Sequence, residues 1–546
     1  MASFTISGNL VNCLTRSLSP AIIHVDSAKI TSIEPLVGSS PNPNLPYIMP
    51  GFIDAHVHIE SSMLVPAAFA HLAVLHGTVA TVSDPHEIAN VCGMEGVDFM
   101  IENGKKVPFK FYFGAPSCVP ATIFETAGDT LDANAVTKLL QRDEVKYLSE
   151  MMNFPGAIAG DQEVMKKINA AQAVGKVIDG HAPGLCGDAL RQYVDRGIST
   201  DHECFTREEA AEKLSMGMKV IIREGSAAKN FDALIGLLDE YPEMMMFCSD
   251  DKHPDSLELG HINQLCSRAV AAGSDVFNVI RAATVNPVLH YRLDVGLLRV
   301  GDPADFILVN NLSDFKVLQT YIDGTLVACN GVSTMPPFIS PENPVNRFNI
   351  GPIKLEDLSC KAEEGKVYPV IGCIDGQLIT EKLDLLPRLE DGCWQPDIDA
   401  DVLKLVVVNR YHQTQVATAF IHRFGLKKGA MASSVAHDSH NIVAVGTDDE
   451  SLLQAINIVI ASRGGISCVG SHENMGLPLP VAGLMSLDAG NKVAAAYTAI
   501  DQFARSLGST LQAPFMCLSF MALLVIPHVK LSDKGLFDGD SFQFYA

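Results

Sequence analysis

The sequence lacks the cysteine patterns that mark a zinc ribbon, a redox dithiol or a secreted disulfide framework. Its thirteen cysteines are scattered over 546 residues, and no two of them form a C-x-x-C pair. Paired cysteines at short spacing are the usual signature of all three classes. We therefore expect most of these cysteines to be small buried apolar residues in a protein of a reducing compartment.

Basic charge and long apolar segments are also scarce. The chain has 40 Lys and Arg against 63 Asp and Glu, a formal net charge of −23, which offers no electrostatic footprint for nucleic acid or an anionic membrane. The longest apolar run, Met516–Ile526, is shorter than the roughly 20 residues that a membrane-spanning helix needs. Residues 1–10 do not show the basic and then apolar pattern of a signal peptide. We expect a soluble, cytoplasmic protein.

Strand-like and helix-like segments alternate from residue 51 onward, which is typical of parallel βα units. Helical periodicity occurs between the strand candidates, for example over 161–174 and 206–217. The eight predicted strands cover residues 51–58, 78–83, 110–114, 146–151, 176–180, 198–202, 219–223 and 244–249. Eight such units in about 230 residues predict an α/β fold, a TIM (β/α)8 barrel. A doubly wound sheet is the alternative, but no glycine-rich phosphate loop follows the first strand.

The rest of the chain reads as two flanking units. Short strands before the barrel, in residues 1–48, and after it, in 291–335, predict one small β-sandwich domain that closes the chain around a catalytic barrel at 49–290. A proline-rich linker near 335–344 precedes a separate C-terminal α/β domain at 345–546. Its role, as a lid, a subunit contact or a source of stability, stays open at this point.

Two histidines one residue apart end the first predicted barrel strand. A Pro50-Gly51 turn starts a short β-rich run that closes with His56 and His58. Alternate side chains of a strand share a face, so both imidazoles point the same way. Two imidazoles that converge at the end of a buried strand suit a divalent metal ion.

Other ligand-type side chains follow the same rule of position. In a TIM barrel the functional side chains lie at the C-terminal ends of the strands. Five of the predicted strands carry histidines or carboxylates there: His56, His58, Glu150, His181, His202 and Asp250. Imidazole and carboxylate ligands suit Fe, Mn or Zn. The set has enough ligands for two metal ions, with Glu150 as the natural bridge.

These motifs resemble those of the amidohydrolase superfamily and, within it, of the bacterial adenine deaminases. The resemblance covers essentially the whole chain, including the domain after residue 345. It is carried by residues 51–63, 83–90, 150–156, 179–184, 249–254, 301–305 and 436–441. It implies metal-dependent hydrolytic deamination of adenine to hypoxanthine and ammonia in purine salvage. It also implies two divalent ions, manganese or iron rather than zinc.

The resemblance further implies roles for individual carboxylates. Asp250 takes a proton from the water nucleophile and delivers it to the ring or the leaving amine, and the bridging Glu150 shares this proton traffic. Asp251 is expected to accept a hydrogen bond from the purine. By default for a soluble enzyme, we expect a homodimer or a higher homo-oligomer.

Alternatives remain at the level of the reaction. Another amidohydrolase, acting on a cyclic amide or a related purine or pyrimidine, would share the metal apparatus. The cytidine-deaminase type of zinc enzyme is less compatible, because His58-Ile59-Glu60 satisfies its H-x-E element but no P-C-x-x-C follows. A non-catalytic relative predicts eroded metal ligands, whereas all six positions are filled here.

Several neighbouring residues have open roles. His86 faces the site as a substrate contact or an auxiliary metal ligand, and Glu60, Glu203 and His253 are expected to support the ligands or the substrate. Lys146 leaves open a carboxylated lysine in place of the Glu150 bridge. The segment 437–440, His-Asp-Ser-His, reads as a turn with side-chain caps rather than a metal cluster.

Overall fold

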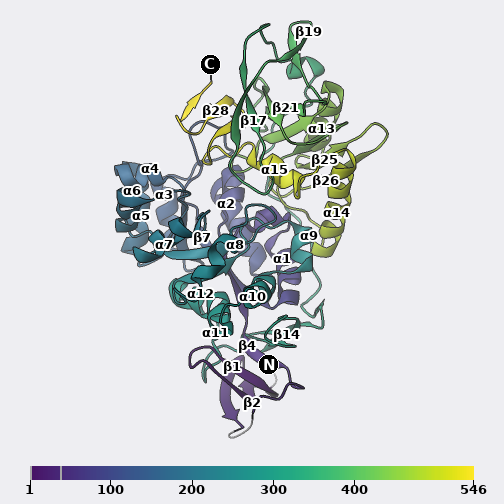
Figure 1. Cartoon of the computed structure of the whole chain (residues 1–546). Helices are drawn as coiled ribbons and strands as arrows, with labels where there is room; N and C mark the ends of the chain where they lie inside the picture. Colours follow the sequence, from purple (N-terminus) through teal and green to yellow (C-terminus); the bar gives the residue numbers. More distant parts are fainter. Residues whose placement is uncertain (1–2, 37–39, 546) are drawn as a thin grey trace.

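The protein has three parts stacked along one axis (Figure 1): a small N-terminal sheet, a central barrel and a C-terminal domain. The structure, a computed structural model, describes residues 3–36 and 40–545. Among the described residues no helix is both long and apolar enough to cross a membrane.

The central part is a parallel barrel whose strands follow the chain in order. They pair as β5-β6-β7-β8-β9 and as β10-β11-β12. Isolated bridges from Ile178 to Ile198 and from Val57 to Asp250 join the two groups and close the ring. The strands are β5 Phe52–Val57, β6 Thr78–Ser83, β7 Lys110–Ala115, β8 Val145–Met151, β9 Val177–Gly180, β10 Thr200–Asp201, β11 Lys219–Arg223 and β12 Met245–Cys248. The predicted barrel fold is thus confirmed.

The strand predicted at 198–202 is shorter than expected. Only Thr200 and Asp201 form β10, and Ile198 contributes a single bridge. Side-chain bonds take over where the ladder stops, because Asp201 accepts from the backbone N–H groups of Ala182 (2.9 Å) and Glu203 (3.1 Å). The carboxylate thereby satisfies backbone donors that a longer strand would have paired.

Helices surround the barrel, and several begin at residues suited to a helix start. The Asp132, Asp161 and Thr206 side chains each accept a hydrogen bond from a backbone N–H in the first turn of α3, α5 and α7. The α-helices are α1 Pro66–Ala73, α2 His86–Gly104, α3 Ala133–Leu140, α4 Phe154–Ala159, α5 Gln162–Ala173, α6 Gly187–Asp195, α7 Arg207–Ser215, α8 Phe231–Leu234, α9 Pro254–Leu259, α10 Ile262–Ala271, α11 Val276–Ile280 and α12 Asn286–Tyr291. Shorter helical turns are η1 Ile59–Ser62, η2 Val74–His76, η3 Ile235–Leu237 and the π-helical η4 Arg281–Val285.

Strands that precede the barrel in the chain and strands that follow it form one eight-stranded sheet, at the end marked N in Figure 1. Its order is β16-β15-β14-β13-β4-β1-β2-β3, and β4 pairs with β13 antiparallel. The segments that enter and leave the barrel are therefore hydrogen-bonded to each other. The strands are β1 Phe4–Asn12, β2 Ser17–Asp26, β3 Lys29–Pro35, β4 Tyr47–Pro50, β13 Phe306–Val309, β14 Val317–Ile322, β15 Thr325–Cys329 and β16 Val332–Ser333.

The C-terminal domain is built on a second eight-stranded sheet, of order β18-β17-β22-β21-β24-β23-β25-β26. Its helices are η5 Leu355–Leu358, α13 Asp449–Ala461, α14 Gly490–Ser506 and α15 Pro514–Phe520. The sheet strands are β17 Tyr368–Gly372, β18 Glu381–Leu385, β21 Val402–Val408, β22 Ala417–His422, β23 Ala430–Ser433, β24 Ile442–Gly446, β25 Gly465–Val469 and β26 Asn474–Pro478. Two smaller sheets contain β19 Arg388–Glu390 with β20 Cys393–Gln395, and β27 Val529–Ser532, β28 Gly535–Asp538 and β29 Gln543–Phe544.

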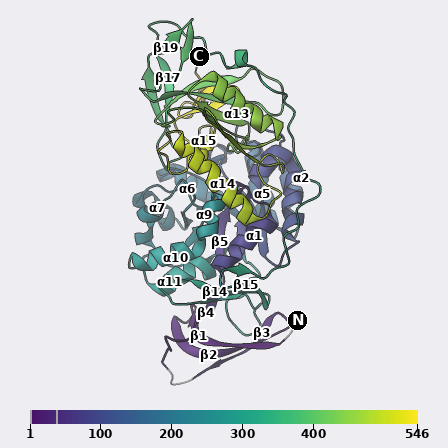
Figure 2. The same ribbon diagram turned by 90° about the vertical axis from the view of Figure 1, so that its right-hand side faces the viewer.

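The C-terminal domain contacts the barrel at the carboxyl ends of its strands. Figure 2 shows α14 running down beside α9 and α1. Hydrogen bonds join the two parts: Ser486 N–H donates to the Met63 carbonyl at 2.8 Å, and Thr126 N–H donates to Asp533 Oδ1 at 2.9 Å. One apolar core runs through both parts. The opening of the barrel is therefore covered by this domain.

Candidate active site

The His56–His58 pair and Asp250 come together at the closure of the barrel. Asp250 N–H donates to the His56 carbonyl at 3.0 Å, and His58 N–H donates to the Asp250 carbonyl at 3.3 Å. Asp250 takes a left-handed backbone conformation, φ +53°, directly after β12. Its Oδ1 lies 3.2 Å from His58 Nε2 and 3.6 Å from His56 Nε2. A non-glycine residue in this conformation is uncommon, and such residues gather at functional sites.

Glu150, at the end of β8, lies between the first two histidines and the other two. Its Oε1 is 3.4 Å from His58 Nε2. Its Oε2 is 2.7 Å from His181 Nδ1 and 3.2 Å from His202 Nε2. The structure thus brings all six ligand candidates together around one carboxylate.

The residues present fit a divalent metal centre. His56 Nε2 and His58 Nε2 face each other at 3.1 Å, both rings are buried, and the two atoms converge on the same carboxylates. Several sets of three or four ligand atoms lie within 4.8 Å of one another, among them His56–His58–Asp250 and His56–Glu150–His202. Imidazole nitrogen with carboxylate oxygen is a donor set that Mn, Fe and Zn accept.

The charges of the site favour ionised carboxylates. Burial by itself raises the pKa of Glu150, but the imidazole of His181 holds that pKa well below its usual value. Burial also raises the pKa of Asp250, and the Arg223 guanidinium beside it outweighs this and keeps the pKa well below normal. Both groups are thus anionic, which is the form in which a carboxylate can bind a metal ion.

Arg223, at the end of β11, is a site residue that the sequence analysis missed. Its Nη1 donates to Asp250 Oδ2 at 2.7 Å, and its guanidinium forms a two-pronged ion pair with Glu203. Its position at the end of the seventh barrel strand is a sequence signal for a site residue, but a guanidinium is not a metal ligand and so falls outside a pattern of histidines and acids. Glu203 also lies 3.5 Å from His202 Nε2, so this buried pair borders the ligand cluster.

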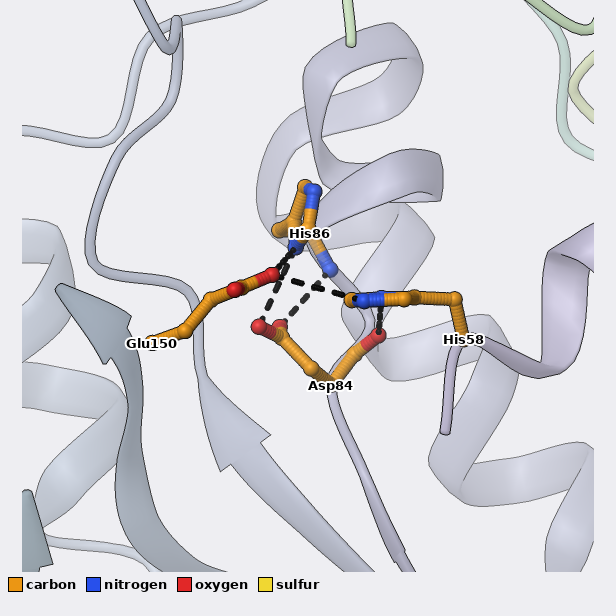
Figure 3. A group of neighbouring side chains, drawn as sticks. All are labelled: His58, Asp84, His86 and Glu150. Carbon is orange, nitrogen blue, oxygen red and sulfur yellow. Dashed lines mark hydrogen bonds and ion pairs between the residues drawn. The ribbon is translucent and has the colours of Figure 1, made fainter. Parts of the chain in front are cut away.

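His86 and Asp84 extend the cluster on the side of β6 (Figure 3). His86 Nδ1 lies 3.1 Å from Asp84 Oδ2 and 3.5 Å from Glu150 Oε1. The carbonyl of Asp84 is 3.3 Å from His58 Nδ1. His58, Asp84, His86 and Glu150 could together hold a metal ion, and Figure 3 shows their side chains converging. The structure therefore places His86 against the ligand cluster, as the sequence analysis expected.

The His-Asp-Ser-His segment of the C-terminal domain is more than the turn that its sequence predicted. His437 Nδ1 and His440 Nε2 each bind one oxygen of Glu87, which lies in the first turn of α2. Asp438 Oδ1 lies 3.5 Å from His86 Nε2. The segment does form the predicted turn, in which His440 N–H donates to the Ala436 carbonyl at 2.7 Å and the His440 ring caps Ala436 N–H. Its contact with Glu87, which is 350 residues away in the chain, was not predicted. His437 and Asp438 line the cleft on the side of the C-terminal domain.

The remaining predicted residues take three different positions. Asp251 accepts a hydrogen bond from Ser61 Oγ at 2.5 Å and lines the cleft. Glu60 accepts from the N–H of Ile88 at 3.2 Å and thus supports α2; burial raises its pKa to about 7. His253 instead packs edge-on against Tyr497, with ring centroids 4.6 Å apart, and burial lowers its pKa to about 3.

The open face of the cluster is a narrow cleft between the barrel and the C-terminal domain. Polar walls come from the ligand residues and from Arg223, Glu203 and Asp251. Apolar walls come from Met152 of the barrel and from Leu378, Leu523 and Val525 of the C-terminal domain. A small, flat, polar ring fits such a mixture of walls.

Two family models match the sequence. The amidohydrolase family model matches residues 47–327, and the model of the adenine deaminase C-terminal domain matches residues 377–543. The adenine deaminase of Salinibacter ruber is 55% identical, with 100% of this chain and 98% of that protein covered. The adenine deaminase of a Sulfurovum species is 54% identical over 99% and 98% of the two chains. The chain belongs to the adenine deaminase family.

Among solved structures, a β-aspartyl dipeptidase from Fervidobacterium islandicum aligns with a TM-score of 0.47 and 15% identity. The alignment covers 61% of this chain and 99% of that one. The adenine deaminase C-terminal domain that the family model covers includes His437 and His440. The family resemblance thus spans both walls of the cleft.

Lys146, the alternative bridge, does not reach the site. It is exposed on β8, whereas Ser149 and Glu150 on the same strand are buried. Lys146 lines a surface hollow with Lys105 and Glu144, away from the cleft. Of these two side chains of β8, only Glu150 lies among the buried histidines of the cleft.

Proposed function

We propose that this chain catalyses the hydrolytic deamination of adenine to hypoxanthine and ammonia. The observation that carries the proposal is the buried set of four imidazoles and two carboxylates around Glu150, in a chain 55% identical over its length to a protein named adenine deaminase. The cleft beside this set is walled by polar and apolar groups in the mixture that a purine requires.

We further propose that the site holds two divalent ions, manganese or iron rather than zinc. The ligands are His56, His58, Glu150, His181, His202 and Asp250. Bound there, divalent ions supply Lewis acidity and bring the pKa of a bound water from about 16 to near 7. His86 and Asp84 lie close enough to Glu150 to complete the coordination on one side.

Asp250 is the group best placed to move the proton. In the overall reaction an oxygen of water bonds to C6 of adenine and the C6–N6 bond breaks. The water must lose a proton, and the amine must gain one before it leaves as ammonia. Arg223 holds Oδ2 and thereby turns Oδ1 toward the histidine pair, where it can take up a proton from the water and return it to the amine. Such general acid–base help is typically worth about 10²–10⁴-fold in rate.

The remaining polar groups orient the ring. Asp251 is held by Ser61 Oγ and presents a carboxylate oxygen to the cleft, where a ring N–H can donate to it. The side chains of Leu378, Leu523 and Val525 exclude water from the ring face. Removing water strengthens every charge interaction within the cleft.

The test is an ammonia-release assay on protein reconstituted separately with Mn or Fe. The substrates are adenine, adenosine, guanine and a dihydropyrimidine. We expect turnover of adenine with the ultraviolet shift of a purine, and its loss in Asp250→Asn with the fold unchanged. Turnover of the dihydropyrimidine with ring opening, and none of adenine, would establish the cyclic-amide alternative instead.

A further inference from the structure

One imidazole of the C-terminal domain faces the cleft with a free nitrogen. His437 lies between β23 and β24, is buried, and lines the cleft. Its Nε2 has no hydrogen-bond partner among the described residues. A buried polar atom without a partner costs free energy, and a ligand is one way to satisfy it.

Glu87 sets the orientation of this ring. One Glu87 oxygen binds His437 Nδ1 and the other binds His440 Nε2. Because a carboxylate only accepts, His437 Nδ1 carries the proton, and the ring is fixed with Nε2 toward the cleft. Glu87 itself stays anionic: burial raises its pKa, but the imidazoles of His437 and His440 hold it well below normal.

His440 makes the same contact with Glu87 but has no free nitrogen. Its Nδ1 accepts a hydrogen bond from Ala436 N–H at 3.2 Å, so both of its ring nitrogens are used. His437 and His440 therefore share burial, loop and partner. They differ in that only His437 turns a nitrogen toward the cleft.

The free Nε2 of His437 lies beside the Asp251 carboxylate, whose Oδ1 also accepts from Ser61 Oγ. The distance from Nε2 to Asp251 Oδ1 is 3.8 Å. Burial alone would lower the pKa of His437, but the Glu87 and Asp251 carboxylates raise it to about 9, so Nε2 is a hydrogen-bond donor at neutral pH. The cleft thus holds a donor and an acceptor side by side.

We propose that His437 and Asp251 together hold the N3/N9 edge of the purine, with His437 Nε2–H donating to N3 and Asp251 accepting from N9–H. Adenine has three edges with a donor next to an acceptor: N6–H with N1, N6–H with N7, and N9–H with N3. The first two include the leaving amine, which has to be free to take a proton from Asp250. The third is the edge left for fixed contacts.

This inference rests on the proposed function and gives the C-terminal domain a direct part in substrate choice. A nucleoside has a sugar on N9, so it lacks the N–H that Asp251 accepts and brings bulk against that carboxylate. Free adenine is therefore the expected substrate, and adenosine is expected to bind poorly. The domain contributes the N3 contact through His437.

The experiment compares 3-deazaadenine and 7-deazaadenine as competitive inhibitors of adenine turnover by the metal-loaded, full-length enzyme. With wild type we expect 3-deazaadenine to bind about 10- to 100-fold more weakly than 7-deazaadenine, the usual loss for one hydrogen bond from a charged donor. In His437→Leu the two inhibition constants should become equal within about threefold, and the KM for adenine should rise while kcat falls less.

His440→Leu is the matched control, because it also removes one imidazole from Glu87. It should keep the wild-type ratio of the two inhibition constants. His437→Gln is the conservative variant, whose amide can reach the position of Nε2 and partly restore the preference. Metal content by elemental analysis and the Tm show whether each variant keeps its fold.

Three results would overturn the proposal. The wild-type enzyme could bind both deaza analogues equally, it could bind 7-deazaadenine more weakly than 3-deazaadenine, or the preference for 7-deazaadenine could persist in His437→Leu. Each of these is distinct from failure of the proposed function, in which the wild-type enzyme releases no ammonia from adenine at all.

Discussion

Arg223 Nη1 donates to Asp250 Oδ2 at 2.7 Å, on the side of the carboxylate that points away from the histidine pair. Both side chains are buried, with 3% of each exposed. The same guanidinium also pairs with Glu203. Arg223 therefore orients the carboxylate that we propose to carry the proton, and it neutralises two buried acids at once.

Replacement of Arg223 should damage catalysis more than metal binding. In Arg223→Leu we expect kcat to fall about 10²-fold or more, because Asp250 loses the contact to Oδ2 that orients its carboxylate. Breaking a buried ion pair also costs about 3–5 kcal/mol of stability. Ammonia release and the Tm measure the two effects. Arg207→Leu, which removes an exposed guanidinium paired with the exposed Glu240, is the control and should change neither appreciably. An active Arg223→Leu enzyme would remove this residue from the mechanism.

Removal of the metal should abolish activity and lower the Tm together. Ions that bind only the folded state stabilise it, by about 2.7 kcal/mol when their free concentration is 100 times the dissociation constant. Dialysis against a chelator, followed by calorimetry and re-addition of Mn or Fe, checks this. The variant His202→Leu should retain less metal than wild type. A chelated protein with an unchanged Tm and full turnover would contradict a structural metal centre.

Lys146→Ala should leave metal content and turnover within about twofold of wild type, because Lys146 is exposed on the outside of β8. Elemental analysis and kcat/KM with and without added bicarbonate provide the measurement. Loss of metal in Lys146→Ala, with recovery of activity by bicarbonate in wild type, would restore the carboxylated-lysine alternative. Glu150→Gln is the companion variant and is expected to lose metal.

Glu125 should make the stability of the protein depend on pH. Burial, reinforced by the nearby Asp438, raises the pKa of Glu125 from its model-compound value of 4.5 to about 8. Between these pH values the folded state keeps a proton that the unfolded state has released. Stability is therefore full below about pH 4.5 and declines as the pH rises to 8, by at most about 5 kcal/mol from this group.

Glu125→Gln removes that dependence. The difference in Tm between pH 5 and pH 8.5 should be smaller in Glu125→Gln than in wild type, as measured by calorimetry at both pH values. Glu102→Gln, at a side chain that is 65% exposed, is the control and should preserve the wild-type difference. An unchanged difference in Glu125→Gln would show that other groups govern this range.

The barrel and the clustering of its candidate ligands were predictable because they obey a rule of local position. Strand candidates such as 78–83 and 219–223 coincide with β6 and β11, and the strand ends alone located His56, Glu150 and Asp250. Alternating runs of β-branched residues and helical periodicity are local signals, and parallel pairing brings their carboxyl ends to one rim.

The side of the site that the C-terminal domain forms was not predictable in the same way. Glu87 and His437 are 350 residues apart, and no periodicity within either segment indicates the other. His253 follows Asp250 and Asp251 closely in the chain. It is, however, the residue at which α9 begins, and its side chain packs against Tyr497. Contacts between domains depend on how whole surfaces pack, which a local pattern does not contain.

The pairing of Glu87 with His437 also sets an order of events during biosynthesis. At about 5–20 residues translated per second, the 350 residues between them take on the order of tens of seconds to emerge from the ribosome. Until then a nascent barrel has its histidines and acids in place but an open, hydrated rim, with the Glu87 carboxylate in water. The cell thus acquires a closed catalytic chamber only when the last third of the message has been read.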